Sequence, residues 1–285
     1  MNPDSSHQRR AMLLLIIVAL LWSTGGFLIK SVTWNPFAIA GTRSAIAALL
    51  MLGYRRRFTF NWSAAQLGGA ACYAATVILF VAANKLTTAA NAILLQYTAP
   101  IYVAILSYWF LRERITKLDL AAIAATTLGM VLFFLDDLSR GGFWGNIAAI
   151  MSGLSFAGTV LFLRKQKDGS PLESVFLGNI LTFLIGLPFS FHAIPNSAGW
   201  LGLVFLGVFQ LGCSYLLYAE AIRHVTAIEG ILIPVLEPIL NPLWVFLLLG
   251  EKPGRWAAAG GIIVLLSVTV RCLMALRQNS RSNVP

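Results

Sequence analysis

The sequence contains very little charge. Only 11% of its 285 residues are Asp, Glu, Lys or Arg, whereas an average soluble domain carries about 25%. Hydrophobic residues make up 58% of the chain and the mean hydropathy is +0.77. This composition argues against a soluble globular domain and indicates a polytopic membrane protein with little mass outside the bilayer.

Residues that commonly serve catalysis or metal binding are also scarce. The three cysteines fall in different apolar segments without metal or redox spacing, and the three histidines lie in predicted loops or tails. The sequence has no GxxxxGK[ST] phosphate loop and no HExxH motif. We therefore expect neither an enzyme nor an ATP-driven pump, and no metal or other cofactor. An intramembrane enzyme acting on lipids is the remote alternative, and it would need convergent acidic or Ser/His groups.

Long apolar runs dominate the rest of the chain. A helix crossing the roughly 30 Å hydrocarbon core needs about 20 mainly apolar residues, and ten such segments can be marked. They cover residues 11–29, 36–53, 64–83, 89–111, 118–135, 143–163, 171–191, 198–220, 228–249 and 256–276.

The basic residues are distributed unevenly between the loops. The net charge of +10 would suggest nucleic acid binding in a soluble chain, but here the positive-inside rule applies. With the N-terminus inside, 15 Lys and Arg lie on the cytoplasmic side, five lie outside, and Arg43 falls within a span. We predict both termini in the cytoplasm, in a bacterial-type inner membrane, and no nucleic acid partner.

An internal repeat divides the ten segments into two sets of five. Residues 83–114 align without gaps on residues 221–252 at an offset of 138, with nine of 32 positions identical, including Pro100 with Pro238. We therefore predict two halves, residues 1–137 and 138–285. Because five is odd, the second half must enter the membrane in the opposite orientation. Inverted repeats are typical of secondary transporters, whose substrate site lies between the halves near the midplane.

These motifs resemble a known family. "ALLWSTGGFLIK" at residues 19–30, "YTAP" at residues 97–100 and "LEPILNPLWVFLLLGE" at residues 236–251 are similar to the drug/metabolite transporter superfamily, EamA-type. Within it, the chain resembles the YddG-type exporters of aromatic and other neutral amino acids. The resemblance covers nearly the whole chain and implies a helical basket with a cavity between the halves.

The ninth segment contains Pro234, Pro238 and Pro242, spaced four residues apart. A proline at position n cannot donate to the carbonyl at n−4, so the carbonyls of Gly230, Pro234 and Pro238 lose their helical partners. Such acceptors are tolerated at membrane depth only against protein or a water-filled cavity. We predict that this strip faces the interior.

Two charged residues are placed within spans. Glu237 shares a face with Pro234 and Asn241 at helical spacing. It is either a proton-sensitive gate, an ammonium-binding group, or a carboxylate that tethers helices through a backbone N–H. Arg43 either binds a substrate carboxylate or pairs with a helix C-terminus or an acidic side chain. We group both with Asn241, with Pro100 and with the three prolines of the ninth segment as gating or coupling candidates.

A neutral amino acid would need aromatic walls and a few hydroxyls or amides. The candidate substrate-binding residues are Trp22, Ser23, Tyr73, Thr76, Gln96, Tyr97, Tyr215 and Tyr218. Tyr97 is the first choice because it lies one turn before the central Pro100. Any single aromatic residue belongs more often to the membrane interface or to packing than to a ligand contact.

The combined hypothesis is a secondary transporter that exports neutral, especially aromatic, amino acids by alternating access. The alternative is the same scaffold carrying drugs, purines or other metabolites. The sequence does not specify the preferred cargo, the energy source or the oligomeric state.

Overall fold

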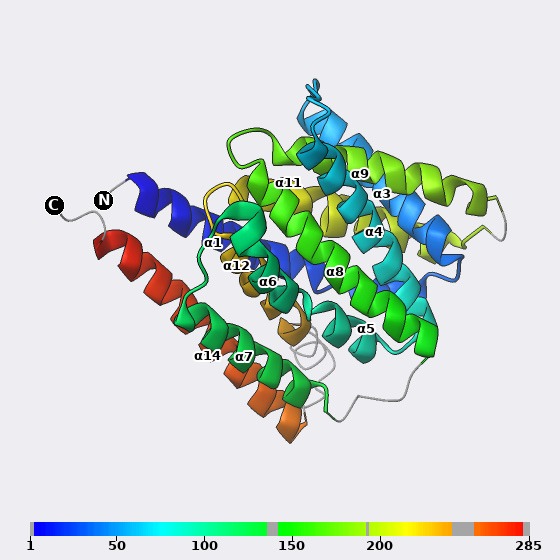
Figure 1. The fold of residues 1–285 in the computed structure, drawn as a ribbon. Coiled ribbons are helices and arrows are strands. Elements are labelled where there is room, and N and C mark those ends of the chain that lie inside the picture. The colour runs from blue at the N-terminus through cyan, green and yellow to red at the C-terminus, as the bar shows by residue number, and fades with distance from the viewer. Residues whose placement is uncertain (1–2, 136–141, 192–193, 241–253, 282–285) are drawn as a thin grey trace.

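The computed structural model describes residues 3–135, 142–191, 194–240 and 254–281, and these ranges contain only helices and loops. The helices form one bundle, in which α7 and α14 run beside each other along one flank (Figure 1). The first turn of α1 (Pro3–Trp22) and the last turn of α14 lie on the same side of the bundle in this view. The all-helical membrane fold predicted from composition is confirmed.

The first half of the chain folds into seven helices. They are α1 (Pro3–Trp22), α2 (Gly25–Ser31), α3 (Pro36–Tyr54), α4 (Ala64–Leu86), α5 (Ala89–Gln96), α6 (Ala99–Leu111) and α7 (Lys117–Phe133). The second half contains α8 (Phe143–Lys165), α9 (Pro171–Gly186), η1 (Leu187–Phe189), α10 (Ser197–Phe205), η2 (Leu206–Cys213), α11 (Ser214–Ala221), α12 (Ala227–Leu232), η3 (Ile233–Leu236) and α14 (Arg255–Arg281).

These helices account for the ten predicted membrane spans. Within the described residues, eight segments are long and apolar enough to cross a membrane. The fifth predicted span corresponds to α7, which has 17 residues. The ninth begins with α12 and η3 and continues into residues 241–253, outside the described ranges.

Side chains that accept hydrogen bonds mark where many of the helices begin. Ser63, Thr88, Thr116 and Thr226 each accept from the backbone N–H three residues on. Such N-caps satisfy donors that the first helical turn leaves unpaired. The short polar loops between the spans therefore set the helix starts.

Helices from the two halves pack directly on each other. The helix α3 lies against α9, and α4 lies against both α8 and α9. Glycines allow the close approach: a Cβ added to Gly260 of α14 would lie 2.4 Å from the carbonyl oxygen of Gly129 in α7. Small residues at such contacts are typical of helix packing in membranes.

Candidate functional site

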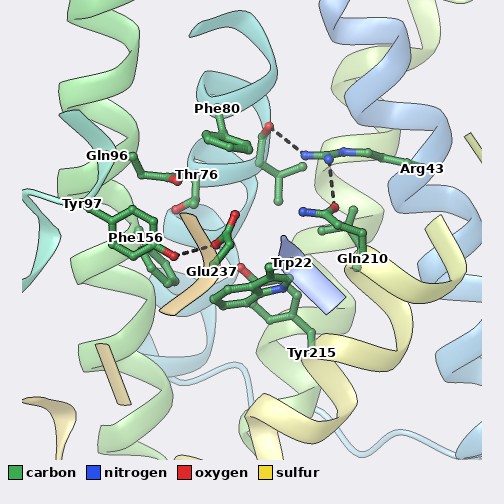
Figure 2. Close-up of a pocket in the computed structure, with 12 residues that line it drawn as sticks. Trp22, Arg43, Thr76, Phe80, Gln96, Tyr97, Phe156, Gln210, Tyr215 and Glu237 are labelled. Carbon is green, nitrogen blue, oxygen red and sulfur yellow. Dashed lines mark hydrogen bonds between the residues drawn. The ribbon is translucent and has the colours of Figure 1, made fainter. Parts of the chain in front are cut away.

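A cavity of about 40 Å³ lies in the interior of the bundle, between the two halves (Figure 2). Its wall is formed by Trp22, Arg43, Thr76, Val77, Phe80, Gln96, Tyr97, Phe156, Gln210, Leu211, Tyr215 and Glu237. Drug-sized ligand pockets are typically about 300–1,000 Å³, so this cavity is much smaller than such a pocket and has room for only a few water molecules.

Four helices are interrupted where they meet the cavity. The first span turns after Trp22, and the fourth turns at Tyr97. The eighth passes through the π-helix η2, which contains Gln210, and the ninth passes through the 3-10 helix η3 just before Glu237. Irregular backbone is tolerated at membrane depth only where protein or a cavity satisfies it, and in transporters such breaks accompany binding sites.

The two prolines of the ninth span that the structure describes free their carbonyls as predicted. The Tyr218 hydroxyl donates to the Gly230 oxygen at 3.0 Å, and the Tyr97 hydroxyl donates to the Pro234 oxygen at 2.9 Å. Both carbonyls belong to buried residues. The prediction that this strip faces the interior is confirmed for these positions. Tyr218 replaces the missing backbone donor at Gly230, whereas the Pro234 oxygen accepts the backbone N–H of Glu237 as well as the Tyr97 hydroxyl.

Glu237 reaches across the cavity to the other half of the molecule. Glu237 is 8% exposed. Its Oε2 atom lies 2.6 Å from the Tyr97 hydroxyl oxygen (Figure 2). A backbone N–H was one predicted partner, but the contact found is with this phenol. The carboxyl group thus connects the ninth span to the fourth.

Arg43 forms the opposite part of the wall. It is 1% exposed, and its guanidinium donates to the Gln210 side-chain oxygen at 3.0 Å and, at 3.5 Å, to the Val77 carbonyl. Its Nε atom is buried without a hydrogen-bond partner, and no carboxylate of the described residues lies within ion-pair distance. Of the two predicted roles, pairing with an acidic side chain is not seen, and a cation this deeply buried is costly without an anion.

Aromatic rings form the remainder of the wall. The Trp22 ring contacts Phe156, Tyr215 and Tyr218, with ring centroids 5.2–5.7 Å apart. Its indole N–H donates to the Ser214 hydroxyl at 2.9 Å, which holds the ring in place. Trp22 therefore lies in the interior, where an aromatic substrate could stack on it.

The predicted substrate-binding residues separate into two groups. Trp22, Thr76, Gln96, Tyr97 and Tyr215 line the cavity. Ser23, Tyr73 and Tyr218 do not: the Ser23 hydroxyl donates to the Leu20 carbonyl and the Tyr73 hydroxyl donates to Asn179 at 3.1 Å.

The predicted gating residues are also divided. Arg43 and Glu237 line the cavity, whereas Pro100, Pro234 and Pro238 lie in the fourth and ninth spans and do not line it. Asn241 and Pro242 lie outside the described residues.

Sequence reasoning missed five residues of the wall, which are Val77, Phe80, Phe156, Gln210 and Leu211. Gln210 was the one that could have been found, because an amide in the middle of an apolar span has to be paired, and it pairs with Arg43. Phe80 and Phe156 carried no such signal, since phenylalanine is common on any membrane helix.

Comparison with known proteins assigns the chain to a family. The model of the EamA-like transporter family matches residues 9–135 and 143–271. The chain belongs to this family. Its members are secondary transporters and not enzymes, so the chain is a multi-pass secondary membrane transporter. The boundary between residues 137 and 138 stays a prediction, and it falls between the two matched ranges.

Relatives of this EamA-like transporter span almost its entire length. An uncharacterized transporter of Archaeoglobus fulgidus is 26% identical over 258 residues, covering 90% of this chain and 94% of the relative. The uncharacterized transporter YxxF of Bacillus subtilis is 24% identical and covers 99% of this chain and 94% of the relative. A crystal structure with 20% identity superposes with a TM-score of 0.77, covering 94% of this chain and 98% of that one. The crystal structure shows the shared fold.

A second polar cluster of the EamA-like chain lies where α1, α7, α12 and α14 meet. Arg271 pairs with Asp119 at 2.5 Å and with Glu229 at 3.4 Å, and Gln8 donates to Glu229 at 3.2 Å. All four residues are less than 9% exposed. The cluster borders a separate cavity of about 170 Å³.

This cluster corrects one interpretation of the sequence. Arg271 was counted with the flanking cytoplasmic residues, but it is 7% exposed within α14 and ion-paired. The acidic residues Asp119 and Glu229, which lie at the starts of apolar segments, could have indicated that a cation is buried with them. Glu229 also completes a capping box with Thr226, in agreement with its position at the start of the ninth span.

Proposed function

We propose that this transporter exports neutral, especially aromatic, amino acids by alternating access through the central cavity. The observation that carries the proposal is that a guanidinium and a carboxyl group, which do not contact each other, line the same aromatic-walled cavity. Arg43 is a fully buried cation whose described surroundings hold no carboxylate partner, and Glu237 is a buried carboxyl group on another wall.

An α-amino acid carries the complementary groups. Its carboxylate fits the guanidinium of Arg43, since such pairs form short, charge-assisted and often bidentate hydrogen bonds. Its ammonium group fits Glu237, and an aromatic side chain fits the rings of Trp22 and Phe156. The cavity of about 40 Å³ is smaller than a typical ligand pocket, so in this proposal the contacts form when the two halves move apart.

The topology belongs to the same proposal. We place the transporter in a bacterial-type inner membrane with both termini in the cytoplasm. Without the buried Arg271, 14 of the 15 predicted cytoplasmic basic residues remain, against five outside. The positive-inside bias therefore persists.

Counterflow in proteoliposomes tests the cargo. Vesicles loaded with unlabelled phenylalanine should take up labelled phenylalanine, and external phenylalanine should compete strongly. Its methyl ester, which lacks the carboxylate, and phenylpyruvate, which lacks the ammonium group, should compete at least about tenfold more weakly, because each loses one charged contact. Adenine provides the comparison for a purine cargo.

Variants of the cavity sharpen the same experiment. Arg43→Gln should abolish the advantage of phenylalanine over its methyl ester, whereas Arg56→Gln, which changes an exposed arginine, should preserve it. Absence of flux with every amino acid in a panel would refute the cargo assignment, and flux of adenine alone would support the alternative cargo.

A further inference from the structure

A third cavity, of about 430 Å³, lies where α1, α3, α9 and α11 meet. It shares no lining residue with the central cavity and has about ten times its volume. Ligand pockets are typically about 300–1,000 Å³. This cavity is therefore large enough for a ligand in the structure as it stands.

The cavity lies at the ends of membrane spans. The candidate span Pro36–Tyr54 ends at the lining residue Tyr54, and the span Pro171–Phe189 begins at the lining residue Pro171. Tyr54 is 74% exposed, and tyrosines at span ends are typical of the boundary between the bilayer and water. A ligand in this cavity would therefore lie at the level of the lipid headgroups.

Three arginines from three different parts of the chain line this cavity. Arg10 belongs to α1, Arg55 directly follows α3, and Arg223 follows α11. Arg10 is exposed, and the side chains of Arg55 and Arg223 are partly exposed. None of the three guanidinium groups is thus enclosed by the protein.

The acidic groups beside these arginines do not balance them. Glu220 lines the cavity and lies 3.7 Å from Arg223, and Glu173 lies 3.8 Å from Arg55. Arg10 forms no ion pair with any residue that the structure describes. The cavity therefore has an excess of positive charge and fits an anion.

The hydrogen bonds of two of the arginines prepare them for such an anion. Nη1 of Arg55 donates to the Ser170 hydroxyl at 2.8 Å, and Nε of Arg223 donates to the Lys167 carbonyl at 3.0 Å. These bonds orient the guanidinium groups and leave other N–H donors on each. Guanidinium groups bind phosphate oxygens through paired hydrogen bonds. The Ser170 side chain does not cap α9, and an uncapped helix N-terminus also favours phosphate.

Apolar side chains distinguish a lipid from a soluble phosphate. Pro171, Leu172 and Leu216 line the cavity together with the arginines. A free phosphate gains nothing from these residues, whereas a phospholipid carries glycerol and acyl carbons directly behind its phosphate. Basic pockets between membrane helices are typical sites for anionic headgroups.

We propose that this cavity binds the headgroup of an anionic phospholipid, with its phosphate held by Arg10, Arg55 and Arg223. The site does not depend on the proposed cargo, because the central cavity has a different set of lining residues.

Native mass spectrometry of the transporter in detergent tests the site. The first molecule of dioctanoyl phosphatidylglycerol should bind at least about fivefold more tightly than dioctanoyl phosphatidylcholine, which has no net charge. Arg10→Gln and Arg223→Gln should each weaken that binding about fivefold, because each removes one cation beside the phosphate. Arg56→Gln removes an exposed arginine that does not line the cavity and should leave the binding unchanged.

Thermal unfolding in the same detergent shows whether the variants fold. Arg10 has no ion pair to lose, so Arg10→Gln should unfold at the wild-type temperature when no lipid is added. Phosphatidylglycerol should raise the unfolding temperature of the wild type more than that of Arg10→Gln, because a ligand stabilises the state that binds it.

Inorganic phosphate and glycerol 3-phosphate separate a soluble ligand from a lipid. If either binds as tightly as phosphatidylglycerol and shows the same loss in Arg10→Gln, the site takes a soluble phosphate and the lipid assignment is overturned. Equal binding of the two lipids, or equal effects of Arg10→Gln and Arg56→Gln, would overturn the proposal as well.

Discussion

The fourth and ninth spans begin with the same kind of threonine N-cap, but the residue whose N–H the cap binds is neutral in one and acidic in the other. Thr88 caps α5 by accepting from the Asn91 N–H at 3.1 Å, and Thr226 caps α12 by accepting from the Glu229 N–H at 3.2 Å. These residues are related by the 138-residue offset of the repeat. Among the described residues, the side-chain partners of Asn91 are neutral, whereas Glu229 belongs to a buried network that contains a cation and a second carboxylate.

The partners of the two residues show the difference. The Asn91 amide donates to Thr87 and to Asn146, and Thr87 also donates to Asn146 at 2.8 Å. Glu229 instead accepts from Gln8 and Arg271, and Arg271 also binds Asp119. An inverted repeat places the two helix starts at opposite ends of the bundle. The two helix starts thus share the N-cap and differ in their buried charge. We call the start of α12, with Glu229, Arg271 and Asp119, the ionic end, and the start of α5 its counterpart.

The largest expected effect comes from removing the cation of the ionic end. Arg271→Met should lower the free energy of unfolding by about 3–5 kcal/mol, because Asp119 and Glu229 would remain as buried carboxylates without their partner. Thermal unfolding in detergent measures the change. Arg57→Met, at an exposed position, is the control and should have little effect. A loss below about 1 kcal/mol for Arg271→Met would show that the two ends do not differ as described.

A smaller effect is expected when the ionic end is made neutral like its counterpart. Glu229→Gln keeps an oxygen for the capping box but loses the charged partner of Arg271, so stability should fall by about 1.5–3 kcal/mol. The matched change Glu220→Gln removes a carboxylate from a surface pair and should cost less than about 1 kcal/mol. Equal losses for the two variants would contradict the importance of charge at this end.

The smallest effects should come from the feature that the two ends share. Thr88→Ala and Thr226→Ala each remove an N-cap, and each should lower stability by about 1 kcal/mol. The same unfolding experiment compares them. A loss at Thr226 several times larger than at Thr88 would mean that the cap also positions Glu229 for Arg271, and would sharpen the contrast between the ends.

Much of the candidate site could be predicted because unusual residues stood in apolar surroundings. Pro234 and Pro238 predicted that the carbonyls of Gly230 and Pro234 would lose their helical donors. Each of these carbonyls accepts a hydrogen bond from a tyrosine hydroxyl. Arg43 and Glu237 were identified as charges within spans, and both line the cavity. In each case the membrane makes an unpaired polar group so costly that its presence implies a partner.

The identity of those partners could not be predicted. Tyr97 and Glu237 are 140 residues apart, and Arg43 and Gln210 are 167 apart. Periodicity places a side chain on a face of its own helix but says nothing about which helix lies opposite. For the same reason Arg271, near the end of an apolar run, was assigned to a flank instead of to a buried ion pair.

The sequence by itself determined the membrane-spanning helices, the twofold repeat and the loss of backbone donors at the prolines of the ninth span. These properties depend on local composition, on spacing and on the missing N–H of proline, all of which are present before the chain folds. Only the tertiary structure decided that Tyr97 shares its hydroxyl between Pro234 and Glu237, and that Arg43 is left without an acidic partner among the described residues. Those outcomes depend on how the two halves pack, because hydrogen bonds and ion pairs form only over a few ångströms.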